Sequence, residues 1–230
     1  MPNRKVRQYL EYLKYSGISE LLLKPGVLTS KPQPSRDESF SGNPGEILQK
    51  LEAQYSDCRK CGLWEGRKKF VYGAGNPRAL LMLIGEGPGY YENEQGKPFV
   101  GKAGELLTKM LRAINLNREQ IYIANVVKCR PPNNRDPLPQ EVAQCLGYLT
   151  EQISIIRPKI LLLLGRVASK NLLGKDLTLR EFRKTTHQFN SIKTYVTYHP
   201  AALLRNSHLK KDAWTDLQKI EQELKALEDR

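Results

Sequence analysis

The chain has 230 residues, of which 40% are hydrophobic, and carries a formal net charge of +13 at pH 7. That length is enough for one sizeable core and an appendage, and no apolar run approaches the ~20 residues that a membrane helix needs. The charge favours a polyanionic partner over a neutral small molecule, although it can also serve solubility alone. No apolar signal region follows the basic start, so we expect a cytoplasmic protein, nucleoid-associated if prokaryotic, with reduced cysteines.

The first 46 residues differ in composition from the rest. Residues 1–26 are basic, with apolar positions at helical spacing, and predict a helical segment. Residues 27–46 are rich in Ser, Pro, Gly and Asp, a composition that cannot build a packed face and predicts a flexible linker. We therefore expect the globular domain to span residues 47–230.

Within this domain, short apolar runs alternate with amphipathic segments. Such alternation predicts an α/β fold, a three-layer αβα sandwich around a central four-stranded parallel sheet. The expected strands are residues 79–84, 121–127, 159–164 and 194–198, and the expected helices are 101–114, 139–156, 166–173 and 211–227.

Four conspicuous features follow the expected strands directly. They are the glycine-rich residues 85–104, the stretch from Asn125 to Cys129, Gly165, and YHPAALLRN at 198–206. Ligands of open parallel sheets bind at the carboxyl ends of the strands. The sequence therefore predicts a site where these four features meet.

The glycine-rich loop does not match the nucleotide-binding motifs. Tyr90 stands where a dinucleotide fingerprint needs its last glycine, and Pro88 with a polar loop argues against an immediate helix. Ala103 replaces the hydroxyl residue that a P-loop places on magnesium. A base or small-molecule pocket remains, with Phe99 as one flat wall, although Phe99 can equally be a core plug and the loop a plain turn.

The four cysteines are compatible with one site. Cys58 and Cys61 form a CxxC pair, and Cys129 follows a strand with Cys145 on the next helix. Four thiolates suit an iron–sulfur cluster or a structural zinc, and the wide second spacing favours the cluster. Unconnected buried cysteines are the remaining alternative.

Three motifs together resemble a known family. GEGPGYYENEQGKPFVGKAGELL, YIANVVKCRPPNNRDPLPQEVAQC and YHPAALLRN, with CRKCGL upstream, resemble the family 4 uracil-DNA glycosylases, the iron–sulfur branch of their superfamily. The resemblance runs from about residue 47 to the C-terminus. It implies a uracil-DNA glycosylase-like fold, excision of uracil from DNA without lysine-nucleophile strand cleavage, and a [4Fe–4S] cluster on Cys58, Cys61, Cys129 and Cys145.

The resemblance also implies roles in the uracil pocket. Phe99 stacks on the flipped base, Asn125 accepts from uracil N3–H and donates to O4, and His199 donates to O2 as the glycosidic bond breaks. Backbone amides of Gly85, Glu86 and Gly87 complete the pocket. Each of two residues also has a structural alternative. Asn125 can be an amide that only completes the end of a strand, and His199 a loop histidine whose hydrogen bonds are satisfied within the protein.

The motifs identify the water-activating group and the DNA-contacting residues less clearly. Gly87 stands where the best-known branch of the superfamily carries Asp, so Glu86 and Glu92 are the candidate catalytic carboxylates. Leu203 and Leu204 are expected in a loop, where they would insert into the DNA base stack at the place that the extruded base leaves. The alternative is that both belong to the hydrophobic core. Arg205 is expected to bind a DNA phosphate.

We therefore expect a monomeric enzyme that acts on single- or double-stranded uracil-containing DNA. A non-catalytic or redox-sensing iron–sulfur DNA-binding module on the same fold is the alternative. A related glycosylase that releases another damaged base is a third possibility.

Overall fold

The computed structural model describes residues 42–228, and Gly42–Arg230 form one compact unit. The helical segment expected over residues 1–26 and most of the expected linker lie outside the described residues. Within the described part of the chain, no helix is long and apolar enough to span a membrane.

The domain begins earlier than residue 47, because helix α2 spans Pro44–Tyr55. Asn43 accepts a hydrogen bond from the Gly45 N–H, and Pro44 occupies the first turn, where its missing N–H is not needed. The last residues of the expected linker therefore start a helix, because Asn and Pro are signals both for loops and for helix starts.

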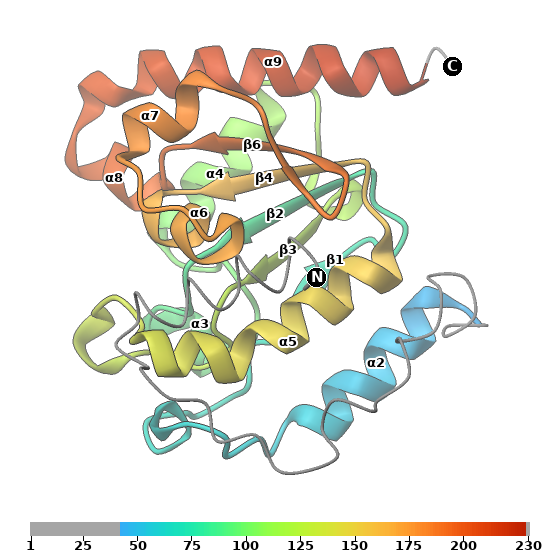
Figure 1. Cartoon of the computed structure of the whole chain (residues 1–230), viewed down its shortest axis with the longest axis vertical. Coiled ribbons are helices and arrows are strands. Elements are labelled where there is room, and N and C mark those ends of the chain that lie inside the picture. The colour runs from blue at the N-terminus through green and yellow to red at the C-terminus, as the bar shows by residue number, and fades with distance from the viewer. Residues whose placement is uncertain (1–41, 229–230) are drawn as a thin grey trace, which may run out of the picture. The chain divides into compact units, whose positions relative to one another are not determined.

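The described residues form one sheet of six strands in the order β1-β3-β2-β4-β6-β5 (Figure 1). The four central strands run parallel, which confirms the predicted α/β fold, and a short antiparallel strand pairs at each edge. Neither edge strand was predicted, since two- and three-residue strands have no detectable period. The strands are β1 Ala74–Gly75, β2 Leu81–Gly85, β3 Tyr122–Asn125, β4 Ile160–Leu164, β5 His187–Phe189 and β6 Ile192–Thr197.

The central strands read as unbroken apolar runs because helices cover both of their faces. On one face, alternate residues of β2, β3 and β4 share a core with α4 (Lys102–Arg112), α8 (Pro200–Arg205) and α9 (Lys210–Glu228). Towards the other face lie α5 (Pro139–Ile156), whose Gln152 reaches Tyr122 of β3, and α6 (Arg166–Leu173), which contacts β4. The four long helices expected from the sequence are thus present: α5 and α6 have the expected ends, and the ends of α4 and α9 are shifted by one or two residues.

Three short helices were not predicted. They are α3 (Tyr90–Gln95), α7 (Leu179–Lys184) and α8. The expectation of a polar loop after Pro88 was wrong, because Gly89 serves as the N-cap of α3 and Pro88 precedes the helix without interrupting it. The expected loop that carries Leu203 and Leu204 is α8, which starts at Pro200 directly after His199.

The carboxyl ends of the four parallel strands open at the same edge of the sheet. Gly85 at the end of β2 pairs with Asn125 at the end of β3. The Gly165 N–H, just past β4, donates to the Thr197 carbonyl at the end of β6 over 2.9 Å. Residues far apart in the sequence therefore meet around one cavity at this edge.

Candidate active site

A cavity of about 380 Å³ lies at the carboxyl ends of the strands. Its wall comes from the β2–α3 loop, the start of α4, the end of β3, the loop before α5, and α8 with the residue before it. Seven residues singled out in the sequence line it: Glu86, Gly87, Glu92, Phe99, Asn125, His199 and Arg205.

Asn125 reaches this cavity from the floor. The side chain is only 1% exposed, and among the described residues its Oδ1 has no hydrogen-bond partner. A buried acceptor without a partner is destabilising by roughly 1–3 kcal/mol, so such a group is normally satisfied by a bound ligand or an ordered water. Asn125 is thus placed to accept a hydrogen bond from a molecule in the cavity.

His199 is the N-cap of α8, and its ring is fixed by that role. Its Nδ1 accepts a hydrogen bond from the Ala201 N–H over 3.2 Å, so the neutral ring carries its proton on Nε2. Burial, and next the positive charge of Arg205, lower the pKa of His199 from 6.5 to about 4. The imidazole is therefore neutral at physiological pH and offers one N–H donor.

Phe99 stands beside His199, with ring centroids 5.5 Å apart and the planes tilted by 34°. The ring is 6% exposed and lies over Gly85, where an added Cβ would come within 2.8 Å of it and would clash with Asn125 Oδ1. Gly85 therefore has to lack a side chain for the ring and the amide to share the cavity. The aromatic residue is both pocket wall and part of the hydrophobic core.

The two candidate carboxylates differ in environment. Burial, and next the charge of Asp136, raise the pKa of Glu86 from 4.5 to about 7. Glu92, by contrast, accepts through Oε1 from the Val100 and Gly101 N–H groups over 2.9 and 3.1 Å. Glu86 is thus a carboxyl that titrates near neutrality inside the cavity, while Glu92 braces the start of α4.

The structure separates the two leucines expected to enter the DNA stack. Leu203 is 2% exposed and belongs to the hydrophobic core, so its assignment as a wedge is not supported. Leu204 is 50% exposed on the next position of α8. A helix sends consecutive side chains to different faces, which a loop assignment could not anticipate.

The four cysteines line a second, small cavity, together with the apolar side chains of Leu63, Trp64, Phe70 and Tyr148. All four are free thiols, and hydrogen bonds already point at the sulfurs of Cys58, Cys129 and Cys145. Tyr148 Oη donates to Cys58 over 3.1 Å and the Lys128 N–H to Cys145 over 3.2 Å. Within residues 42–228, no three His, Cys, Asp or Glu side chains gather closely enough to hold a single metal ion.

Lys128 was missed by the sequence analysis. It is fully buried, and its Nζ donates to the Asn125 carbonyl over 3.0 Å and to Gln152 Oε1 over 2.6 Å. Burial lowers its pKa from 10.5 to about 7. This lysine ties the turn after Asn125 to α5, and its position in an apolar run, VVKC, was the only signal in the sequence.

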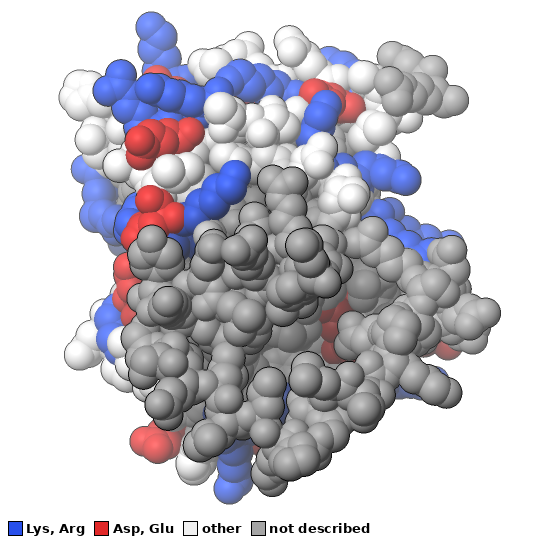
Figure 2. Space-filling model, viewed as in Figure 1, with Lys and Arg blue, Asp and Glu red and all other residues white. Residues whose placement is uncertain are grey.

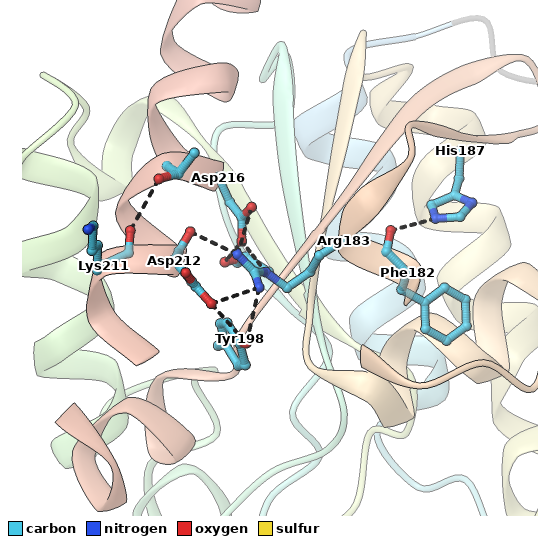
Figure 3. Close-up of polar contacts among 9 residues, drawn as sticks. Phe182, Arg183, His187, Tyr198, Lys211, Asp212 and Asp216 are labelled. Carbon is cyan, nitrogen blue, oxygen red and sulfur yellow. Dashed lines mark hydrogen bonds and ion pairs between the residues drawn. The ribbon is translucent and has the colours of Figure 1, made fainter. Parts of the chain in front are cut away.

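Arg183 was also missed, since nothing in the sequence marks it. Figure 3 shows its guanidinium held among Asp212, Asp216 and Tyr198. Its Nε lies 2.6 Å from Asp216 Oδ2, which also accepts from the Thr197 hydroxyl over 2.9 Å. This network joins α7 and α9 to the end of β6 and so supports the backbone that leads into His199.

The other described histidine in this region has a structural role. His187 is buried, and its Nε2 donates to the Phe182 carbonyl over 2.8 Å (Figure 3). It does not line the cavity, so His199 is the histidine that the fold brings to the site.

Comparison with known proteins agrees with the geometry. The profile described as Uracil DNA glycosylase superfamily matches residues 72–218. A type-4 uracil-DNA glycosylase of Sulfurisphaera tokodaii is 44% identical over 193 residues, covering 76% of this chain and 84% of the relative. The type-4 uracil-DNA glycosylase of Archaeoglobus fulgidus is 41% identical, over 76% of this chain and 92% of its own length. That of Saccharolobus solfataricus is 44% identical, over 73% of this chain and 82% of its own length. The chain therefore belongs to the uracil DNA glycosylase superfamily and, within it, to the type-4 uracil-DNA glycosylases.

Proposed function

We propose that this chain removes uracil from DNA by hydrolysing its N-glycosidic bond, and that the cavity at the strand ends holds the extruded base. The observation that carries the proposal is the buried Oδ1 of Asn125, to which no residue of the described part of the chain donates a hydrogen bond. Uracil N3–H would supply the missing donor, and O4 would accept from the same amide. Cytosine presents the opposite polarity at these two positions, so it would leave buried polar groups unpaired.

His199 is the group that acts on the leaving base. As the glycosidic bond breaks, its electron pair moves onto uracil and negative charge develops at O2. A neutral imidazole with its proton on Nε2 can donate to that oxygen, and such a donor contributes ~3–4 kcal/mol in a transition state. The low pKa and the Ala201 contact support this role, because they keep the ring in one protonation and tautomeric state.

Of the two carboxylates, Glu86 is the stronger candidate for the group that acts on the sugar and on the attacking water. As a carboxylate it would stabilise the cationic sugar and accept the proton of the attacking water. Its raised pKa fits a group that has to exchange a proton near pH 7. Glu92 is already committed to two backbone N–H groups, so we assign it a supporting part.

The DNA itself would be held mainly through phosphates. The chain carries a net charge of +13, and Figure 2 shows Lys and Arg side chains around α7 and α9, with fewer acidic ones between them. Arg205 lines the cavity and is suited to a phosphate beside the extruded base, while Leu204 is exposed enough to fill the gap in the stack.

The cysteine cavity suits a [4Fe–4S] cluster in its donor chemistry. Four free thiols line one apolar cavity, and a cluster places one thiolate on each iron, farther apart than the ligands of a single zinc ion. Cys58, Cys61, Cys129 and Cys145 would hold it, and it would join the segment before the sheet to the loop before α5. The resulting role is structural, since no step of the hydrolysis needs an electron.

The proposal is tested with a labelled oligonucleotide that carries one uracil, single-stranded or paired with G or A. The expected result is an abasic site, seen as strand cleavage only after alkali, and no product from the matching thymine or cytosine strand. Asn125→Asp should lose uracil excision, because an ionised carboxylate repels O4. A protein that binds the oligonucleotide but leaves no alkali-labile site would instead favour the non-catalytic module.

A further inference from the structure

Phe99 has a backbone conformation that its residue type disfavours. Its φ is +53°, in the left-handed region that bulky side chains rarely adopt. Such a conformation is destabilising by ~1–3 kcal/mol and persists only where the surroundings enforce it. Some group other than Phe99 itself must therefore hold this segment in place.

Packing around the segment is uneven. On the side away from the base site lies a second cavity of about 490 Å³, and Phe99 lines both cavities. On another side Gly104, in the first turn of α4, stands so close that an added Cβ would overlap the Phe99 carbonyl. The backbone of Phe99 thus lies between a close helix and an open space.

Arg118 spans that open space. Its Nη1 donates to the Phe99 carbonyl over 3.0 Å and its Nη2 to the Pro98 carbonyl over 2.8 Å. The side chain is half-buried and lines the second cavity. On the opposite side Glu92 accepts from the next two N–H groups of the segment. The peptide that carries Phe99 is therefore held from both sides by polar groups.

The position of Arg118 in the chain connects this contact to the base site. Arg118 lies four residues before β3, the strand that ends in Asn125. Its planar fork therefore links the segment that carries the ring to the strand that carries the base-reading amide. A guanidinium can bond two carbonyls at once in a fixed geometry, which a lysine ammonium cannot reproduce.

We propose that Arg118 is a positioning residue that holds the Phe99 ring at stacking distance from the base read by Asn125. The inference rests on the proposed uracil excision. Arg118 does not touch the base or the sugar. It acts through Phe99, so its removal should weaken engagement of uracil more than it weakens attachment to DNA.

The test is a double-mutant cycle between Arg118→Met and Phe99→Ala, with the matched control Arg112→Met. Arg112 is exposed in the last turn of α4 and loses the same charge. For each variant, single-turnover excision is measured against enzyme concentration, which separates half-saturation from maximal rate. Binding to a uracil-free strand and the Tm are measured in parallel.

Arg118→Met should raise the half-saturating concentration on uracil DNA by ~10-fold, as expected for partial loss of a stacking wall. Uracil-free binding and the Arg112→Met variant should change less than about twofold, the scale of one exposed charge. In the Phe99→Ala background, Arg118→Met should have no further effect, because its only route of action is gone. Arg118→Lys should show a smaller rise in the half-saturating concentration than Arg118→Met. If Arg118→Met lowers the Tm below the assay temperature, the double-mutant cycle with Phe99→Ala is carried out with Arg118→Lys instead.

Three results would overturn the proposal. The first is near-wild-type half-saturation in Arg118→Met. The second is an equal loss of uracil-free binding, which would make Arg118 a phosphate contact. The third is a double variant whose rise in half-saturating concentration equals the product of the rises in the two single variants, because the two residues would then act independently. Absence of excision by the wild-type protein would refute the proposed function instead, so the two failures can be told apart.

Discussion

Replacing Glu86 with glutamine should make the protein more stable at pH 8 while slowing uracil excision. The substitution keeps the shape of the side chain and removes its ionisation. In the fold, burial and Asp136 raise the pKa of this carboxyl from 4.5 to about 7. Below pH 4.5 both the folded and the unfolded chain hold the proton, so Glu86 has no net effect on stability there.

As the pH rises from 4.5 to 7, the unfolded chain releases the proton while the folded chain retains it, and stability is lost. Above pH 7 the loss is complete. A difference of 2.5 pKa units, 7 minus 4.5, corresponds to at most about 3 kcal/mol. Because the side chain is partly open to water, we expect about 1–2 kcal/mol after screening.

The assay is thermal unfolding of wild type and Glu86→Gln at pH 5 and pH 8, with Glu105→Gln as an exposed control. Glu86→Gln should raise the Tm by roughly 2–8 °C at pH 8 and by much less at pH 5. Single-turnover excision by wild type should rise with pH through about 7 and level off. The variant should be slower by ~10- to 100-fold and lack that step.

The reasoning fails if Glu86→Gln shifts the Tm equally at both pH values, or if the pH step in excision survives the substitution. The first result would mean that Glu86 is not held protonated by the fold. The second would mean that another group carries the titration.

The remaining predictions concern the base site and the thiols. His199→Ala should slow single-turnover excision by ~100- to 1000-fold with little change in affinity for uracil DNA, and equal losses in both would contradict leaving-group stabilisation. Gly85→Ala should abolish excision while uracil-free binding persists, because the new Cβ would clash with Asn125 Oδ1. Wild-type activity in this variant would show that the site has room for a side chain at position 85. Purified protein should be brown and contain about four irons per chain, as a [4Fe–4S] cluster requires, whereas a colourless protein with stoichiometric zinc would exclude the cluster. Cys129→Ser should lower the Tm more than it lowers the excision rate per folded molecule.

Much of the architecture follows from local patterns in the chain. The four parallel strands and the helices α4, α5, α6 and α9 were predicted, because apolar runs and helical periodicity record which faces are buried. The convergence of Asn125, His199 and the glycine-rich loop followed from the predicted parallel direction of the strands, since parallel strands end at one edge of the sheet. The cysteine spacing and the three motifs indicated the family before any contact was known.

What depends on the exact path of short segments was not predictable. The six-residue helices α3 and α8 contain too few residues to show a period, so Leu203 and Leu204 looked equivalent although one is core and the other is exposed. The roles of Glu86 and Glu92 likewise depend on which one finds backbone N–H partners, and only the fold decides this.

The sequence by itself determined the fold class, the family and the edge of the sheet where the base site lies, because periodicity and motif spacing are properties of the chain alone. Only the tertiary structure decided the supporting groups, namely Arg118 behind Phe99, Lys128 beneath Asn125 and Arg183 beside the strand of His199. Each is a cation to which no motif assigned a role, and each has a partner on another element that lies 20 or more residues away. A charged side chain acquires its role from the acceptors that surround it, and those are assembled only when the elements pack together.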